Sequence, residues 1–140
     1  MLNLSLLRES LAQATDREPI ITRRFYEILF ARYPGVRPLF GRDSARQQQM
    51  LQEALVAVLD HIEDARWLET TLGSLGAKHI DYGVTEEMYA WVGECLIATL
   101  AELVGDDWTP AHTEAWQQAY DAIAQLMLRG AASMPTSAVA

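Results

Sequence analysis

Cysteine is almost absent from this chain of 140 residues, since Cys95 is the only one. A single cysteine excludes an intramolecular disulfide and a metal site built from several thiolates, and it fits a reducing compartment. Basic residues are also scarce, because 11 Lys and Arg stand against 19 Asp and Glu and leave a net charge of -8. This balance argues against a nucleic acid or an anionic membrane surface as the main partner.

Long hydrophobic runs are missing as well. The longest apolar run is Ala54–Leu59, whereas a transmembrane helix needs roughly 20 such residues. The N-terminal segment Met1–Glu9 has neither the basic start nor the continuous apolar core of a signal peptide. We therefore expect no membrane span and a cytoplasmic location.

Strand signals are absent too, because no stretch alternates with period 2 and no Asn-Gly hairpin pair occurs. The chain is 50% hydrophobic and 21% charged, which is typical of one globular domain at this length. We expect that domain to span residues 1–130. The small and polar residues 131–140 should form a flexible tail, with nothing folded after residue 130.

Apolar residues instead recur with helical spacing along most of the chain. The expected helices cover residues 3–14, 19–33, 45–62, 64–79, 85–104 and 109–129. Pro19 and Pro110 suit first helical positions, and Asp43 or Ser44 is a candidate N-cap. Thr85 reads as a further cap and Gly105 as a C-terminal stop. The sequence therefore predicts an all-α fold.

A set of residues at fixed spacing then resembles the globin module of flavohaemoglobins and their single-domain bacterial relatives. Tyr26 and Phe40 lie 14 positions apart, Phe40 and Gln47 lie 7 apart, Gln47 and His79 lie 32 apart, and His79 and Tyr89 lie 10 apart. The resemblance covers about residues 5 to 129 and includes Trp116 and Tyr120. It implies a globin fold of six to eight helices around a haem b pocket.

The resemblance makes His79 the metal ligand, bound to the haem iron on the proximal side through one ring nitrogen. On its own, a lone histidine in a helix is more often a core or surface residue. His61 and His112 are the competing candidates. His61 lies beside acidic residues near a helix end, and His112 lies in a first helical turn, so we expect His61 to be solvated and His112 to be exposed.

The resemblance assigns the catalytic, distal side to Tyr26 and Gln47. The Tyr26 phenol would donate a hydrogen bond to bound oxygen, and Gln47 would donate to the same ligand or orient the tyrosine. Without the resemblance Tyr26 reads as a core aromatic residue, and the run Gln47–Gln49 reads as a solvated face. Which of the two residues dominates ligand stabilisation stays open.

The remaining cofactor contacts implied by the resemblance come from several helices. With His79, they are Phe40, Leu51, Leu55, Lys78, Val84, Tyr89, Val92, Leu96 and Trp116. The apolar members would also be predicted to be buried as ordinary core residues, because haem forms part of a globin core. Lys78 and Arg46 are weaker candidates for contacts to the haem propionates.

One position departs from the family pattern. Flavohaemoglobins place a glutamate of the last helix beside the proximal histidine, and that position falls near Ala131 here. The segment Leu126–Ala140 contains no Asp or Glu. We expect the N–H at the second ring nitrogen of His79 to donate a hydrogen bond to the Leu75 carbonyl or to water instead. This would weaken electron donation to the iron.

Functionally, the resemblance implies a haem protein that binds O2 tightly and also takes NO and CO. Conversion of NO and O2 to nitrate would need a separate flavin reductase, because the reductase half of a flavohaemoglobin is not expected in this chain. The alternative is a haem-free globin-fold module for protein interaction or stress sensing. Storage or delivery of oxygen, detoxification and sensing stay open, as does the oligomeric state.

Overall fold

The computed structural model describes residues 3–18, 20–39, 44–81 and 84–133, and of residues 44, 79–81 and 131–133 it describes the backbone alone. Within these ranges the chain forms six α-helices and two 3-10 helices, with no strand. They are α1 Leu4–Arg17, α2 Ile21–Arg32, η1 Pro34–Leu39, α3 Ser44–Asp60, α4 Ala65–Asp81, α5 Glu86–Val104, η2 Gly105–Asp107 and α6 Pro110–Ser133. The all-α prediction is confirmed.

Some helices end where the sequence signals predicted, and others extend further. α5 ends at Val104, and Gly105 caps it with a φ of 76°, in the region that favours glycine. Before α5, the Thr85 N–H donates to Met88 Sδ at 3.4 Å. α1 continues past Ala14 to Arg17, and α6 continues to Ser133 rather than ending near residue 129.

Two proposed helix starters, Pro19 and Asp43, lie outside the described residues, so their roles stay predictions. The expected tail begins inside α6, because residues 131–133 are helical, and residues 134–140 lie outside the description. The domain boundary at residue 130 therefore stays a prediction.

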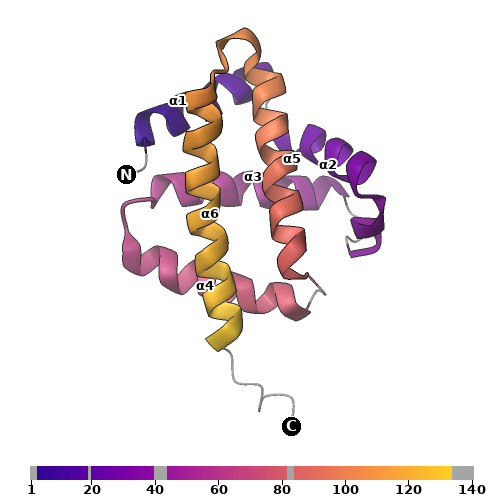
Figure 1. Cartoon of the computed structure of the whole chain (residues 1–140), viewed down its shortest axis with the longest axis vertical. Coiled ribbons are helices and arrows are strands. Elements are labelled where there is room, and N and C mark those ends of the chain that lie inside the picture. Colours follow the sequence, from indigo (N-terminus) through magenta and orange to yellow (C-terminus); the bar gives the residue numbers. More distant parts are fainter. Residues whose placement is uncertain (1–2, 19, 40–43, 82–83, 134–140) are drawn as a thin grey trace.

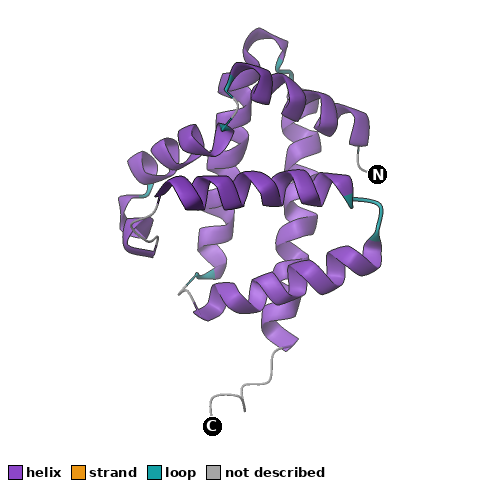
Figure 2. Ribbon diagram, turned by 180° about the vertical axis from the view of Figure 1, so that it is seen from behind, coloured by secondary structure: helices purple, strands orange, loops and turns teal. Residues whose placement is uncertain are grey.

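The helices form two crossed layers. α5 and α6 run side by side. α3 and α4 both cross this pair, at different points along its length (Figures 1 and 2). α4 packs most extensively on α6, while α2 packs on both α5 and α3, and α1 packs on α5 and α6. Among the described residues, α2 makes the most extensive backbone approach to α3. The C-terminal part of α3 also reaches the core, because Leu59 joins the larger cluster and Val58 packs with Leu72 of α4 in the smaller one.

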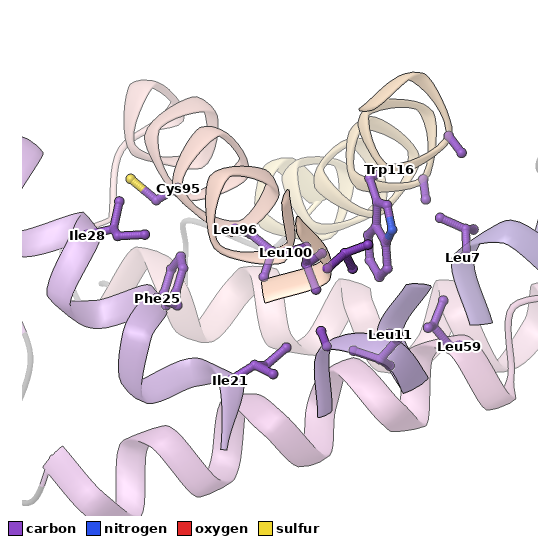
Figure 3. Packing of buried hydrophobic residues seen from close by; sticks show 14 of the residues in the cluster. Leu7, Leu11, Ile21, Phe25, Ile28, Leu59, Cys95, Leu96, Leu100 and Trp116 are labelled. Carbon is purple, nitrogen blue, oxygen red and sulfur yellow. The ribbon is translucent and has the colours of Figure 1, made fainter. Parts of the chain in front are cut away.

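The hydrophobic core is divided into two clusters. The larger one gathers buried residues of α1, α2, α5 and α6 together with Val36 of η1 and Leu59 of α3. Figure 3 shows several of them converging: Leu7, Leu11, Ile21, Phe25, Leu96, Leu100 and Trp116. The smaller one joins residues of α3, α4, α5 and α6 and consists of Val58, Leu72, Tyr89, Ala124 and Met127. The half-buried Tyr120 packs against both clusters.

α5 with η2, Glu86–Asp107, is long and apolar enough to meet the length and composition test for a membrane-spanning helix. Its mean hydropathy is 1.3, and 44% of the apolar window is buried inside the protein. Because α1, α2 and α6 all pack on α5, this helix has the environment of a central core helix. Core helices of soluble proteins pass the same test, so it is weak evidence for a membrane span.

Candidate functional site

Tyr26 lies on α2 among aromatic side chains. Its ring meets Phe25 edge-on with 5.0 Å between centroids and stacks on Phe30 at 5.6 Å. Burial raises the pKa of the Tyr26 phenol to about 12, because a phenolate loses hydration there. The hydroxyl therefore keeps its proton at neutral pH and can act as a hydrogen-bond donor.

Gln47 lies on α3, which faces α2 through two hydrogen bonds. The Thr22 hydroxyl donates to the Gln48 carbonyl at 2.6 Å, and the Ile21 N–H donates to Gln52 Oε1 at 3.1 Å. Tyr26 comes one helical turn after Thr22, and Gln47 directly precedes Gln48. The two predicted distal residues are thus carried by the same pair of facing helices.

The burial of the three glutamines also tests the alternative prediction that Gln47–Gln49 form a solvated face. Gln49 is exposed, whereas Gln47 and Gln48 are half-buried. The distal role of Gln47 stays a prediction, but the run as a whole is not a fully solvated face.

The predicted cofactor contacts separate into two groups by burial. Leu96 and Trp116 are buried in the larger cluster, with 5% and 3% of their surface exposed, and Tyr89 is buried in the smaller one. Four apolar residues are only half-buried: Leu51, Leu55, Val84 and Val92. The two leucines lie on α3 and pack against the larger cluster, and part of their apolar surface remains uncovered.

Trp116 is held toward α1. Its Nε1–H donates to Ser10 Oγ at 2.8 Å, and that hydroxyl donates to the Leu6 carbonyl at 2.7 Å. A buried indole N–H needs such a partner. These bonds explain the burial of Trp116 by core packing, and its contact with a cofactor stays a prediction.

The metal-ligand prediction falls on α4. His79 belongs to the last turns of this helix, but its side chain lies outside the described part of the structure, as does all of Phe40. Lys78 is exposed. The roles of these three residues, and the expected hydrogen bond from His79 to Leu75, stay predictions.

α4, the helix that carries His79, lies so close to α6 that the backbones of the two helices leave no room for a side chain between them. A Cβ added at Gly76 would lie 1.9 Å from the Met127 carbonyl oxygen, and one added at Gly130 would lie 2.2 Å from Gly73 Cα. Only glycine allows this approach at Gly76 and Gly130. This contact was not predicted from the sequence, although the Gly73-x-x-Gly76 spacing places two glycines on one face of the helix.

The two competing histidines are placed differently from expectation. His112 was expected to be exposed, and this is wrong, because only 9% of it is accessible. Its Nδ1 accepts the Thr109 N–H at 3.1 Å, and its ring lies against Trp108 with centroids 5.0 Å apart. The backbone N–H of Thr109 at the start of α6 needs a hydrogen-bond acceptor, which His112 supplies. The η2 corner covers the imidazole ring.

His61 was expected to be solvated and is half-buried instead. Its Nδ1–H donates to the Ala57 carbonyl at 2.9 Å, and its ring stacks on Trp67 with centroids 4.1 Å apart. Within the described residues, no group of three or more His, Cys, Asp or Glu side chains could hold a metal ion. Neither His61 nor His112 therefore belongs to a multi-ligand metal site there.

Comparisons with known proteins bear on the whole helical part of the chain. A family model described as Globin matches residues 23–127. A flavohemoprotein from Bordetella pertussis is 35% identical over 111 residues, which cover 77% of this chain and 28% of that protein. A globin-like protein from Aquifex aeolicus is 31% identical over 108 residues, which cover 77% of this chain and 76% of that one. The chain thus spans little more than a quarter of the flavohemoprotein's length.

Solved structures agree with these sequence matches. An engineered carbene transferase from Rhodothermus marinus, whose parent is assigned as a nitric oxide dioxygenase, superposes with a TM-score of 0.81 at 31% identity. That match covers 97% of this chain and 94% of the other. A bacterial globin from Campylobacter jejuni superposes with a TM-score of 0.79 at 26% identity, covering 92% and 94% of the two chains.

Proposed function

Since the chain belongs to the globin family, we propose that it binds haem b and holds a diatomic gas, O2, NO or CO, beside Tyr26 and Gln47. The observation that carries the proposal concerns the facing helices α2 and α3. Tyr26 and Gln47 are half-buried hydrogen-bond donors on them, and Leu51, one turn after Gln47, leaves apolar surface uncovered. An apolar pocket with a few placed polar groups is the usual form of a small-molecule site.

The residues present fit a haem group. A haem is a flat and largely apolar molecule, and Leu51, Leu55, Val84 and Val92 offer apolar surface that the protein itself covers only in part. His79 on α4 would supply the iron ligand, and the exposed Lys78 and Arg46 would reach the propionates at the rim.

When bound, the haem supplies the iron atom to which the gas attaches. Tyr26 would provide the main donor, because its phenol stays protonated and can donate to a ligand atom that gains negative charge. Phe25 and Phe30 pack against the Tyr26 ring, and their apolar surroundings would strengthen this hydrogen bond. The Gln47 amide adds a second donor from α3.

A hemin titration tests this proposal. Purified protein should develop a sharp Soret band at one equivalent of hemin. His79→Ala should lose stable haem binding, or retain it only with added imidazole, while the matched variant His61→Ala should keep the band. A protein without a Soret band would favour the haem-free module, and loss of haem in His61→Ala alone would show that the ligand is misassigned.

We further propose that the haem-loaded protein converts NO to nitrate. The reaction NO + O2 + e⁻ → NO3⁻ consumes one electron for each NO, so turnover needs a reductant. The supporting comparisons are flavohemoproteins and a carbene transferase whose parent is assigned as a nitric oxide dioxygenase. A separate flavin reductase would supply the electron to this chain.

Stopped-flow mixing of the oxygenated protein with NO tests the reaction step. Stoichiometric nitrate should form in one turnover without any reductase, and continued turnover should appear only when a flavin reductase and NAD(P)H are added. Nitrite as the main product, or slow reaction limited by NO binding, would instead favour a role in oxygen storage or delivery.

A further inference from the structure

Tyr120 of α6 makes a close and directional contact with α5. Its hydroxyl donates to the Tyr89 carbonyl at 2.6 Å. Its ring lies against Gly93, where an added Cβ would come within 2.6 Å of Tyr120 Cε2. Tyr89 and Gly93 are one helical turn apart, so one tyrosine contacts two successive turns of α5 on the same face.

The same ring lies between the two parts of the core. It packs against the larger cluster and also against the smaller cluster that contains Tyr89. Burial, together with the neighbouring Tyr89 and Asp121, raises the pKa of the Tyr120 phenol far above its ordinary value. The hydroxyl is therefore a permanent donor to the Tyr89 carbonyl.

This bond is additional to the helical ladder of α5. In an α-helix a carbonyl accepts from the N–H four residues later, which pairs Tyr89 with Gly93, and a carbonyl oxygen can accept two bonds. Loss of the Tyr120 hydroxyl would leave the ladder of α5 intact. The hydroxyl thus restrains where this turn of α5 lies rather than whether it is helical.

We propose that Tyr120 is a positioning residue, which through the Tyr89 carbonyl and Gly93 fixes the turn of α5 that presents Tyr89 and Val92 to the pocket. Its effect on the haem rests on the proposed function, whereas its effect on Tyr89 does not.

The first test needs no haem. Protein labelled with ¹³C at tyrosine Cζ gives one resonance per tyrosine, and Tyr89→Phe identifies the Tyr89 signal. Tyr120→Phe should shift that signal. The matched control is Tyr33→Phe, which also removes a phenol bonded to α5, but on the solvent side, where Tyr33 donates to Glu94 at 2.8 Å. The control should leave the Tyr89 signal in place.

Gly93→Ala approaches the same contact from the other helix, because its Cβ would push the Tyr120 ring away. It should reproduce the Tyr89 shift of Tyr120→Phe. If Gly93→Ala fails to fold, Tyr120→Phe decides alone, since it removes one oxygen and adds no bulk. An unmoved Tyr89 signal in Tyr120→Phe overturns the proposal, whatever the protein does with hemin.

The second test uses haem-loaded protein. Tyr120→Phe should shift the iron–histidine stretching band in resonance Raman spectra of the ferrous form and speed haem loss by roughly two- to tenfold, the range expected for one lost hydrogen bond. The C–O stretch of the CO form, which reports on the Tyr26 side, should stay unchanged. A lower melting temperature with an unshifted iron–histidine band would mean a structural role only and would overturn the positioning role.

Discussion

Replacing Tyr26 by phenylalanine should speed oxygen release while leaving the fold intact. The change removes one hydroxyl from a half-buried ring and keeps its packing against Phe25 and Phe30. Bound oxygen gains negative charge, and a hydrogen bond to a charged acceptor contributes about 1.5–3 kcal/mol. Since 1.4 kcal/mol is tenfold in affinity and such differences appear mostly in dissociation, the off-rate should rise roughly ten- to a hundredfold.

The environment of Tyr26 keeps its hydroxyl protonated. Burial raises the phenol pKa to about 12, so the proton stays on the oxygen at neutral and mildly alkaline pH. Gln47→Leu should act in the same direction but less strongly, because the amide sits on a longer and more flexible side chain than the phenol.

The assay is stopped-flow displacement of oxygen by excess CO, followed at the Soret band. Tyr33→Phe serves as the matched control, since its phenol binds Glu94 at the surface. Dissociation of CO should change much less than that of oxygen, because CO gains less charge. An oxygen off-rate within a factor of two of the original in Tyr26→Phe would refute the reasoning, and a sharp rise in Gln47→Leu alone would reverse the two roles.

Two further changes test the packing and the surface charges. Gly76→Ala should destabilise the protein by about 3 kcal/mol in urea unfolding, because its Cβ would overlap the backbone of α6. Gly35→Ala, which meets nothing within 4 Å, should stay within about 0.5 kcal/mol, and equal stability of the two variants would contradict the close crossing. The Arg32 guanidinium and then the Tyr33 hydroxyl lower the pKa of Glu94 below its ordinary value, so its stabilising effect is present above the ordinary carboxyl pKa and is lost as the pH falls below it. Glu94→Gln should make stability less sensitive to acid in that range, and an unchanged acid profile would show that the pair contributes nothing measurable.

The helices themselves could be predicted from the sequence, because helical periodicity and end signals act over a few neighbouring residues. The stop at Gly105 is an example, since its positive φ is a local property of the chain. The spacing of Tyr26, Gln47 and His79 also sufficed to indicate the family. α2 and α3 indeed bring the first two onto facing helices.

Contacts between distant segments were decided only by the tertiary structure. A first-turn position made His112 look exposed, yet the η2 corner places Trp108 over it. The tie between Tyr120 and Tyr89 and the crossing at Gly76 depend on how deeply α6 settles against α5 and α4. The glycine spacing on α4 indicates that a close approach is possible, but the depth itself is set by the combined packing of several helices and cannot be read from a local pattern.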